Sequence, residues 1–406
     1  MKVIKASGSQ MQKIYGRDLR IKKRISEKVA KIIEDVRVLG DEAVLKYTRK
    51  FDKVKLNVKH LKVSETEISG AFQNIDPQFV ATLKLIIENV TKFYTKQLKR
   101  SWKIKGDEDI SLGEKITPLK RVGIYIPAGT APLVSTVYMT VIPAKIAGVE
   151  EIILTAPPNK YGSIDPHILA VANLLNVDAF YKIGGAQAIA ALAFGTKTVP
   201  RVDKIVGPGN IYVSEAKRQV YGFVGLDMLA GPSEIVVLAN NLDHIDFIAA
   251  DLEAQLEHLS GMAILVTPSK KLAHALQKRI GHGYIVLVKN LQEAVEVTNR
   301  IAPEHLEIMV KNPRGLLKKI KNAGAIFLGP YSPVALGDYA AGPSHVLPTA
   351  GTARFSSGLS TNDFVKRSHV ISYTKRALEK VRQPIERIAQ LEGLEKHIKS
   401  IKVRFE

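Results

Sequence analysis

The spacing of apolar positions along this chain changes near residue 121. Before that point, apolar side chains recur at helical intervals, most clearly over residues 26–36 and 80–94. After it, short apolar runs alternate with longer segments of helical spacing. We expect strands at 122–126, 151–155, 179–183 and 204–207, and helices at 131–147, 167–175 and 186–193. Such an alternation predicts a parallel sheet with right-handed helical crossovers.

A second alternation of the same kind begins after residue 234. Its expected strands lie at 235–238, 263–266, 285–288, 305–310 and 325–328, and its expected helices at 246–258, 270–279, 291–300 and 313–321. From about residue 371 the chain is charged and helical. The pattern therefore predicts an α/β fold with two Rossmann-like parallel-sheet domains and helical N- and C-terminal segments.

Three turns of small residues follow strands of the first expected sheet. They read PAGT at 127–130, GGAQ at 184–187 and GPGN at 207–210. Ligands of parallel sheets bind beyond the carboxyl ends of the strands, where small residues let backbone N–H groups approach a phosphate. None of the three is a complete G-x-G-x-x-G motif, so an ordinary tight turn stays open as an alternative to a dinucleotide site.

The longest segment without a regular periodicity is GDYAAGPSHVLPT, at residues 337–349. It carries Asp338 and His345 among Gly, Ala and Pro, and we expect a loop. Loops of this length are often functional. An ordered surface loop, in which Asp338 caps a turn and His345 is solvated, stays open as the alternative.

Gln255 and His258 are three positions apart in the expected helix 246–258, so they should share one face of that helix. With Asp338 and a further His they would form a mixed nitrogen and oxygen site, which suits zinc or manganese. The alternative is a surface helix with ordinary polar positions, because one sequence does not show that these segments meet.

Glu304 and His305 are adjacent where an expected helix gives way to a strand. Neighbouring side chains of a strand point to opposite faces, so both reach one substrate only at a bend, which Pro303 permits. Glu304 would then serve as a base and His305 as an acid or base. A helix exit with a solvated His is the alternative. The chain has no Cys, so any aldehyde oxidation would need an activated water in place of a thiolate, which is a role for Glu304.

Composition narrows the classes of function. The 406 residues are 46% hydrophobic and 24% charged, and no apolar run reaches the ~18 residues of a membrane span. The net charge of +20 invites a nucleic-acid interpretation. However, the Lys and Arg residues are spread widely and are not interleaved with aromatic residues. We therefore expect no nucleic-acid partner and no membrane. The lack of Cys and of a signal-peptide core indicates a cytoplasmic protein.

Several long motifs occur in order between about Arg121 and His397. They read RVGIYIPAGTAPLVSTV, GGAQAIAALAFGT, VDKIVGPGNIYV, AGPSEIVVLA, APEHLE, GDYAAGPSHVLPT and EGLEKH. Together they resemble the histidinol dehydrogenase family. The resemblance implies an aldehyde-dehydrogenase-like arrangement of domains and an enzyme that oxidises L-histidinol to L-histidine through histidinaldehyde. It also implies two NAD per substrate, dependence on zinc, and the last step of histidine biosynthesis. A relative acting on another amino alcohol and a binding protein without activity stay open.

The resemblance also implies roles for individual residues. One Zn²⁺ per subunit would be held by Gln255, His258, Asp338 and His397. His397 would come from the other subunit of a homodimer with a domain-swapped C-terminal tail. Glu304 and His305 would be catalytic, with His305 taking the alcohol proton and Glu304 activating water. Further substrate contacts would come from Ser233, His345 and Glu392, and NAD contacts from Tyr125, Gln187 and Asn210.

Four segments are expected from these assignments. Residues 1–20 would form an N-terminal helical arm, and residues 21–126 plus 233–353 a discontinuous α/β domain for metal and substrate. Residues 127–232 would form the NAD-binding α/β domain, and residues 354–406 the helical tail exchanged between subunits.

Overall fold

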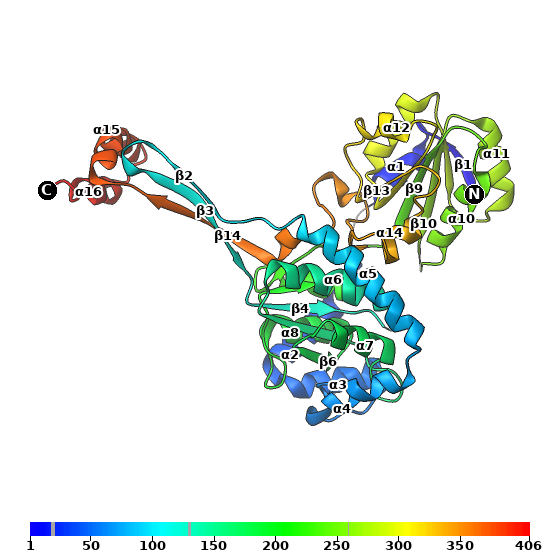
Figure 1. The fold of residues 1–406 in the computed structure, drawn as a ribbon, viewed down its shortest axis with the longest axis horizontal. Helices are drawn as coiled ribbons and strands as arrows, with labels where there is room; N and C mark the ends of the chain where they lie inside the picture. The colour runs from blue at the N-terminus through cyan, green and yellow to red at the C-terminus, as the bar shows by residue number, and fades with distance from the viewer. Residues whose placement is uncertain (18–20, 129–130, 259) are drawn as a thin grey trace. The chain divides into compact units, whose positions relative to one another are not determined.

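The computed structural model describes residues 1–17, 21–128, 131–258 and 260–406. Contacts divide the chain into two compact units. The larger, called the core unit, contains Met1–Gln97 and Leu119–Phe364. The smaller, called the tail unit, contains Leu98–Pro118 and Val365–Glu406. The core unit holds two parallel sheets, each flanked by helices, so the predicted α/β class is confirmed (Figure 1).

The first sheet contains all four strands predicted between residues 121 and 207. In spatial order it consists of β6 (Ala179–Lys182), β5 (Glu151–Ala156), β4 (Arg121–Tyr125), β7 (Lys204–Val206) and β8 (Gly225–Leu226), all parallel. The chain builds from β4 outward to β6 and then returns to add β7 on the other side of β4. The boundary between β4 and β7 is therefore a topological switch point, where ligands of such sheets bind.

Helices cover both faces of the first sheet. On one face α6 (Val134–Ala147) and α7 (Pro166–Leu174) pack together, with α5 (Pro77–Thr95) against α6 and α4 (Glu65–Ala71) against α7. The other face shares an apolar core with α2 (Lys23–Leu39), α3 (Asp41–Phe51), α8 (Gly185–Phe194) and α9 (Ile211–Val220). The strands are buried from both sides, which explains why they read as continuous apolar runs.

The second sheet contains the five strands predicted after residue 234. Its order is β1 (Lys2–Lys5), β11 (Tyr284–Leu287), β10 (Met262–Thr267), β9 (Glu234–Ala239), β12 (His305–Met309) and β13 (Ala325–Leu328), all parallel. One apolar core includes α10 (Ile245–Leu256) and α11 (Lys270–Arg279), and the other includes α1 (Ser9–Tyr15) and α12 (Leu291–Ile301). Two short helices, α13 (Pro313–Leu317) and α14 (Val334–Tyr339), flank β13.

The N-terminal third of the chain differs from the expected division. Residues 2–5 were expected to be helical, but they form β1, which extends the second sheet by pairing with β11. Residues 21–126 were grouped with the second sheet, yet β4 is the centre of the first sheet and α2 and α3 pack in its core. Helical periodicity identifies an apolar face but not the sheet that this face covers, so the sequence pattern could not assign these helices.

The tail unit combines a small sheet with two helices (Figure 1). Its antiparallel strands are β2 (Trp102–Lys105), β3 (Ser111–Pro118) and β14 (Val365–Ser372), and its helices are α15 (Lys375–Leu391) and α16 (Glu395–Lys402). The helices confirm the predicted helical C-terminal segment. The strand β14 was missed because it pairs along its whole length with β3, which lies some 250 residues earlier in the sequence.

Two predicted segments end at different residues in the structure. Gly337 and Asp338 belong to α14 instead of an irregular loop. The helix α10 ends at Leu256, so Gln255 lies in its last turn and His258 lies beyond its end. The prediction that these two residues share a helix face was therefore wrong, because the chain leaves the helix between them.

Short 3₁₀ turns complete the chain: η1 (Val58–His60), η2 (Phe72–Asn74), η3 (Asp107–Asp109), η4 (Thr352–Arg354) and η5 (Thr361–Phe364). In the described ranges, no helix combines the length and the apolar character that crossing a membrane requires.

Candidate active site

The small-residue turns lie at the carboxyl ends of β4, β6 and β7, as predicted. Gly129 and Thr130 of PAGT fall outside the described residues. GGAQ begins α8 at Gly185, and GPGN leads into α9 at Ile211. Because β4 and β7 are neighbours, their carboxyl ends lie side by side at the switch point. This arrangement supports a dinucleotide at that edge of the first sheet.

Tyr125 joins two of these turns. Its side chain is buried, and its hydroxyl oxygen accepts a hydrogen bond from the backbone N–H of Gly185 at 3.1 Å. Burial raises the pKa of Tyr125 to about 12, so the hydroxyl stays neutral. Tyr125 thus fixes the start of α8 relative to the end of β4.

Gln187 and Asn210 are the last residues of the GGAQ and GPGN turns, and their side chains have different environments. Gln187 is buried, and neither atom of its amide has a hydrogen-bond partner among the described residues. A buried amide without partners is costly, which indicates that a ligand supplies them. Asn210 caps α9, because its Oδ1 accepts from the N–H groups of Tyr212 and Val213 at 3.0 and 3.1 Å. Contact of either residue with NAD stays a prediction.

The bend expected at Glu304 and His305 is present. The helix α12 ends at Ile301, and the next residue, Ala302, has a left-handed φ of +49°. The strand β12 begins at His305, shortly after Pro303. Both side chains are buried and face each other, with Oε2 of Glu304 at 3.6 Å from Nδ1 of His305. This pair lies at the amino end of its strand, whereas the turns of the first sheet lie at carboxyl ends.

Ser233 and Glu234, at the amino end of β9, hold this pair. The hydroxyl of Ser233 and the N–H of Glu234 both donate to Oε2 of Glu304, at 2.6 and 2.9 Å. The carbonyl oxygen of Glu234 lies 3.1 Å from Nδ1 of His305. A carbonyl oxygen only accepts, so Nδ1 carries a proton and Nε2 is the basic nitrogen of the neutral ring. In the described chain Nε2 makes no hydrogen bond shorter than its 3.6 Å contact with Oδ1 of Asp338.

Arg17 supports the same assembly from the N-terminal segment. Its guanidinium contacts the buried carboxylate of Glu234 through two nitrogens, at 2.7 and 2.8 Å. It also donates to the carbonyl oxygen of Ile301 at 3.0 Å, one residue before the bend. Sequence analysis missed Arg17, because no local pattern connects it to residues more than 200 positions away.

Burial sets the acid–base character of the pair. It raises the pKa of Glu304 to about 7, against the opposing effects of the His305 charge and the bonds from Ser233 and Glu234. A pKa near neutrality suits a general base. Burial lowers the pKa of His305, but the charges of Glu304 and Asp338 outweigh it and raise the pKa to about 9. Asp338 Oδ1 lies 3.6 Å from Nε2 of His305.

A cavity of about 200 Å³ lies beside the pair and gathers several predicted residues. Its wall includes Ser233, His258, Glu304, His305, Asp338 and His345. These side chains come from four segments that are separated in the sequence. The segments do meet, which the sequence could not show, although the roles of the individual residues stay predictions.

Ser135 is a cavity residue that sequence analysis did not single out. Its hydroxyl lies 3.1 Å from Nε2 of His345, at the start of α6. Burial lowers the pKa of His345, which favours its neutral ring. The sequence signal for Ser135 was a polar residue opening an apolar helix after PAGT, which is also the signal of an ordinary helix start.

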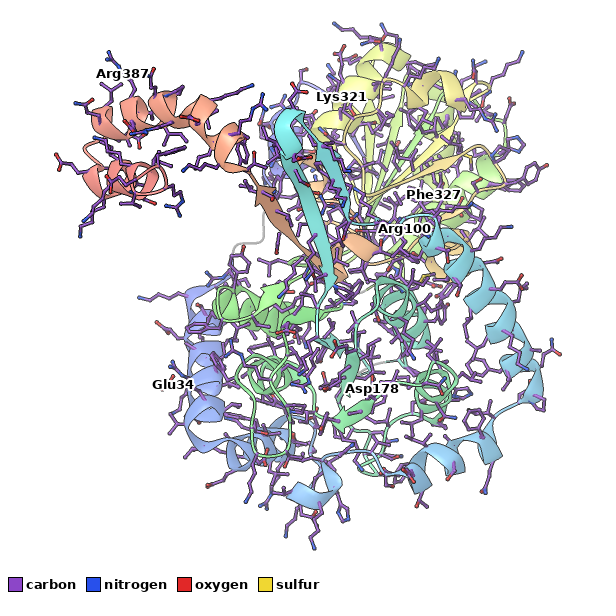
Figure 2. All side chains as sticks on the ribbon, turned by 60° about the vertical axis from the view of Figure 1, so that its left-hand side comes forward. Glu34, Arg100, Asp178, Lys321, Phe327 and Arg387 are labelled. Atoms are coloured by element: carbon purple, nitrogen blue, oxygen red, sulfur yellow. The ribbon has the colours of Figure 1, made fainter. Side chains whose placement is uncertain are left out.

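A larger cavity of about 560 Å³ shares His305, Asp338 and His345 with the first. Its other walls are mostly apolar and include Tyr94 of α5 and Phe327 of β13, which is labelled in Figure 2. The rings of Phe327 and His305 have centroids 6.1 Å apart. A ligand with a polar end and a longer apolar part would therefore meet polar groups at one end of this cavity and apolar walls along the rest of it.

The candidate metal ligands of the core unit fit a mixed nitrogen and oxygen site only in part. His258 and Asp338 line the smaller cavity, and the buried Gln255 precedes His258 by three residues, with its Nε2 unpartnered within the described ranges. Among those residues, no group of three or more His, Asp or Glu side chains is arranged to hold a metal. The set in the core unit is an amide, an imidazole and a carboxylate, which is one ligand short of the four that zinc prefers.

The two remaining predicted residues belong to the tail unit. Glu392 caps the C-terminus of α15, and His397 lies in α16. Both side chains are exposed. The predicted roles of Glu392 and His397 therefore concern residues of the tail unit, and these roles stay predictions.

One parallel sheet carries the switch-point turns, and the other carries a buried Glu–His pair at the amino end of a central strand. These are features of an α/β dehydrogenase. A family model described as histidinol dehydrogenase matches residues 17–405. The chain therefore belongs to the histidinol dehydrogenase family of oxidoreductases, and the resemblance found in the sequence is confirmed.

Individual relatives agree with this assignment. Histidinol dehydrogenase of Clostridium acetobutylicum is 49% identical over 393 residues, which are 92% of this chain and 91% of the relative. That of Bacillus cereus is 48% identical over 405 residues, covering 95% and 94%. The crystal structure of histidinol dehydrogenase from Elizabethkingia anophelis superposes with a TM-score of 0.93 at 34% identity, covering 100% of this chain and 98% of that one.

Proposed function

We propose that this protein catalyses the four-electron oxidation of L-histidinol to L-histidine, the last step of histidine biosynthesis. In the first half, the primary alcohol loses a hydride to NAD⁺ and a proton to the enzyme, which leaves histidinaldehyde. In the second half, water adds to the aldehyde and the hydrate loses a second hydride to a second NAD⁺. One histidinol, one water and two NAD⁺ thus give one histidine, two NADH and three protons.

The observation that carries this proposal is the buried Glu304–His305 pair, which Ser233 and Glu234 hold by hydrogen bonds. A two-stage oxidation needs a base for the alcohol and a base for water, and both must reach one substrate. The left-handed residue Ala302 turns both side chains into one cavity. A chain without Cys has no thiolate route for the aldehyde, so the water route is the one that its residues can serve.

His305 serves the alcohol step. Its Nδ1 is directed to the carbonyl oxygen of Glu234, which fixes the ring and leaves Nε2 as the acceptor on the cavity side. Because the ring is buried, the proton passes to a positioned nitrogen and not to bulk water. In its neutral form, which becomes the main form only above a pH of about 9, His305 would take the hydroxyl proton while the hydride leaves the same carbon.

Glu304 serves the aldehyde step. Two donors hold its Oε2, so the carboxylate is oriented, and burial keeps its pKa near 7. At neutral pH a substantial fraction is ionised and ready to take a proton from water. The water attacks the carbonyl carbon, and Glu304 holds the released proton until the second hydride has left.

Zinc and NAD are the cofactors of the proposal. Gln255, His258 and Asp338 would hold Zn²⁺ together with His397, and the ion would supply a Lewis acid that orients the substrate. NAD would supply the hydride acceptor at the switch point, near Tyr125, Gln187 and Asn210. The unpartnered amides of Gln187 and Gln255 support both sites, because each is a buried polar group that lacks a partner in the described chain.

A homodimer would complete each site. The core unit offers three of the four proposed zinc ligands, and the fourth lies in the tail unit. The tail unit also exposes large apolar side chains, including Trp102, Ile371 and Leu391 at 51%, 72% and 75%. Surfaces of this kind are buried in stable oligomers. We therefore propose that Glu392 and His397 act in the site of the other subunit, and that residues 365–406 form most of the exchanged segment.

NADH formation with L-histidinol and NAD⁺ tests the proposal. The purified protein is assayed as isolated, after removal of metal with a chelator, and after addition of zinc. Two NADH per histidinol, lost on chelation and restored by zinc, is the expected result. One NADH per substrate would contradict the role of Glu304. No NADH from zinc-loaded protein would overturn the substrate, and other amino alcohols would then be assayed.

A further inference from the structure

A pair of carboxyl groups that the proposed reaction does not use lies beneath the active site. Glu307 is on β12, two residues after His305, and is only 1% exposed. Residues two apart in a strand share a face, so both side chains lie on the same side of the second sheet. Asp251, on the neighbouring helix α10, is half-buried and within hydrogen-bonding reach of Glu307.

The two oxygens of the Glu307 carboxyl group have different surroundings. Oε1 of Glu307 accepts from the backbone N–H of Val334 at 3.0 Å. Val334 is the first residue of α14, and Pro333 before it has no side-chain group that could cap the helix. Glu307 therefore takes the place of a capping residue for α14. The second oxygen, Oε2, has no donor in the described chain, and the protonated Glu307 donates to the Asp251 carboxylate.

The surroundings allow one negative charge at most. Ile248, Leu252, Met309 and Val334 belong to the apolar core that encloses the pair. Burial and the charge of Asp251 raise the pKa of Glu307 to about 9, and burial also raises the pKa of Asp251. Besides Asp251, His305 is the charged group that affects the pKa of Glu307, and its positive charge lowers that pKa. Two carboxyl groups in contact in such a site retain a proton between them.

Two of the elements joined by this pair carry proposed metal ligands, and the third, β12, carries His305. Asp251 lies one helical turn before Gln255 on α10, and His258 follows. Glu307 lies on β12 beside His305. Val334 lies four residues before Asp338 on the short helix α14. A single hydrogen-bonded connection from α10 through β12 to α14 thus spans all three segments.

We propose that Asp251 and Glu307 share one proton and act as a positioning pair, which holds α10, β12 and α14 in the register that zinc binding requires. The part that concerns zinc rests on the proposed function. Partners that orient ligands of a metal site commonly change its affinity by about 10- to 100-fold. Loss of the pair should therefore weaken zinc binding without removing a ligand.

Two types of variant separate this role from general packing. In Glu307→Gln, the amide oxygen can still accept from Val334 and the amide N–H can donate to Asp251, so the variant imitates the protonated acid. Asp251→Asn does the same from the other side. Glu307→Met has a similar volume and loses both bonds. Glu296→Gln, which neutralises an exposed glutamate on α12, is the matched control.

The first measurement uses metal-free protein, so it does not depend on zinc. The folded pKa of Glu307 is above its ordinary value of 4.5, so its contribution to stability is complete below about 4.5 and declines as the pH rises toward 9. The melting temperature of the wild type should fall over this range, and the fall should be smaller in Glu307→Gln but unchanged in Glu296→Gln. The N–H of Val334 should stay protected from hydrogen exchange in Glu307→Gln and lose protection in Glu307→Met.

The second measurement is zinc affinity by competition with a chromophoric chelator. Glu307→Gln should bind within about threefold of the wild type, and Glu307→Met about 10- to 100-fold more weakly. Equal losses in the Gln and Met variants, or wild-type affinity and Val334 protection in Glu307→Met, would overturn the inference. If the wild type bound no zinc, the proposed metal site would fail, while the exchange and pH measurements would still decide whether the pair positions α14.

Discussion

Ser233 donates its hydroxyl proton to Oε2 of Glu304 across 2.6 Å, at the point where β9 and β12 begin side by side. The backbone N–H of Glu234 donates to the same oxygen at 2.9 Å. One oxygen of the proposed base is thereby fixed by two donors. The arrangement makes the orientation and the pKa of Glu304 depend on one small side chain.

Removing the carboxylate should separate the two halves of the reaction. We expect Glu304→Gln to leave oxidation of the alcohol partly intact and to slow oxidation of supplied histidinaldehyde by about 100-fold or more, because the amide cannot take a proton from water. In the wild type, the aldehyde step should speed up as the pH rises through about 7, since only ionised Glu304 is a base. Rapid-mixing kinetics of NADH formation would measure each half. Equal loss in both would show that Glu304 does not act on water.

Replacing Ser233 should shift the pH at which Glu304 becomes active. The hydrogen bond from Ser233 lowers the pKa of Glu304, so its loss in Ser233→Ala should raise that pKa and move the rate increase of the aldehyde step to higher pH. Loss of one bond to a charged group corresponds to roughly tenfold in rate near neutral pH. Ser233→Thr keeps the hydroxyl and serves as the control. A pH profile that stays unchanged in Ser233→Ala would refute this coupling.

A buried ion pair supports the GPGN turn. Lys217 and Asp227 are 2% and 0% exposed and contact each other directly. Lys217 donates to the carbonyl oxygen of Gly207 at 2.9 Å, and Asp227 accepts from the N–H of Gly207 at 2.8 Å. Lys217→Met leaves the Asp227 charge uncompensated, so the free energy of unfolding should fall by about 3–5 kcal/mol. Denaturant unfolding monitored by circular dichroism would measure the loss.

An exposed pair provides the comparison for that experiment. Arg279 and Asp246 form an ion pair with side chains that are 46% and 82% exposed. Asp246→Asn should cost less than about 1 kcal/mol, since water screens exposed pairs. An equal cost for both variants would mean that burial of Lys217 and Asp227 does not matter to stability.

The KM for NAD should also rise in a folded Lys217→Met sample, because Gly207 begins the turn at the switch point.

Mixed dimers would show whether His397 acts on the other subunit. His397→Ala and Glu304→Gln should each be inactive in the complete reaction as homodimers. In a mixed dimer with exchanged tails, one site would combine both substitutions and the other would have neither. Random mixing of equal amounts should therefore restore about one quarter of wild-type activity. Co-expression with two affinity tags isolates the mixed dimer, and the doubly purified dimer should show about one half of wild-type activity. No recovery in a mixed dimer of confirmed composition would place His397 in the site of its own chain.

Local patterns determined most of the fold. Apolar runs bounded by Gly, Pro and polar residues located the strands from Arg121 to Leu328, because a strand buried on both faces needs apolar residues throughout. The turns around Gly185 and Gly207 followed, since each lies where a predicted strand ends. The adjacent Glu304 and His305 were identified as a pair for the same reason: a predicted strand begins there, and Pro303 precedes it.

Partners distant in the sequence decided the rest. The strands β1 and β14 exist because they pair with β11 and β3. β1 has only four residues, and β14 is exposed along almost its whole length, so neither shows an apolar pattern of its own. Asp338 became helical because Glu307 satisfies the first N–H of α14, which no neighbour in sequence could do. The pKa of Glu304 and the support from Arg17 arise from burial and from contacts across more than 200 positions. The sequence therefore determined which groups and turns this protein has, and the tertiary structure alone decided which of them face one another, since only packing removes water from between them.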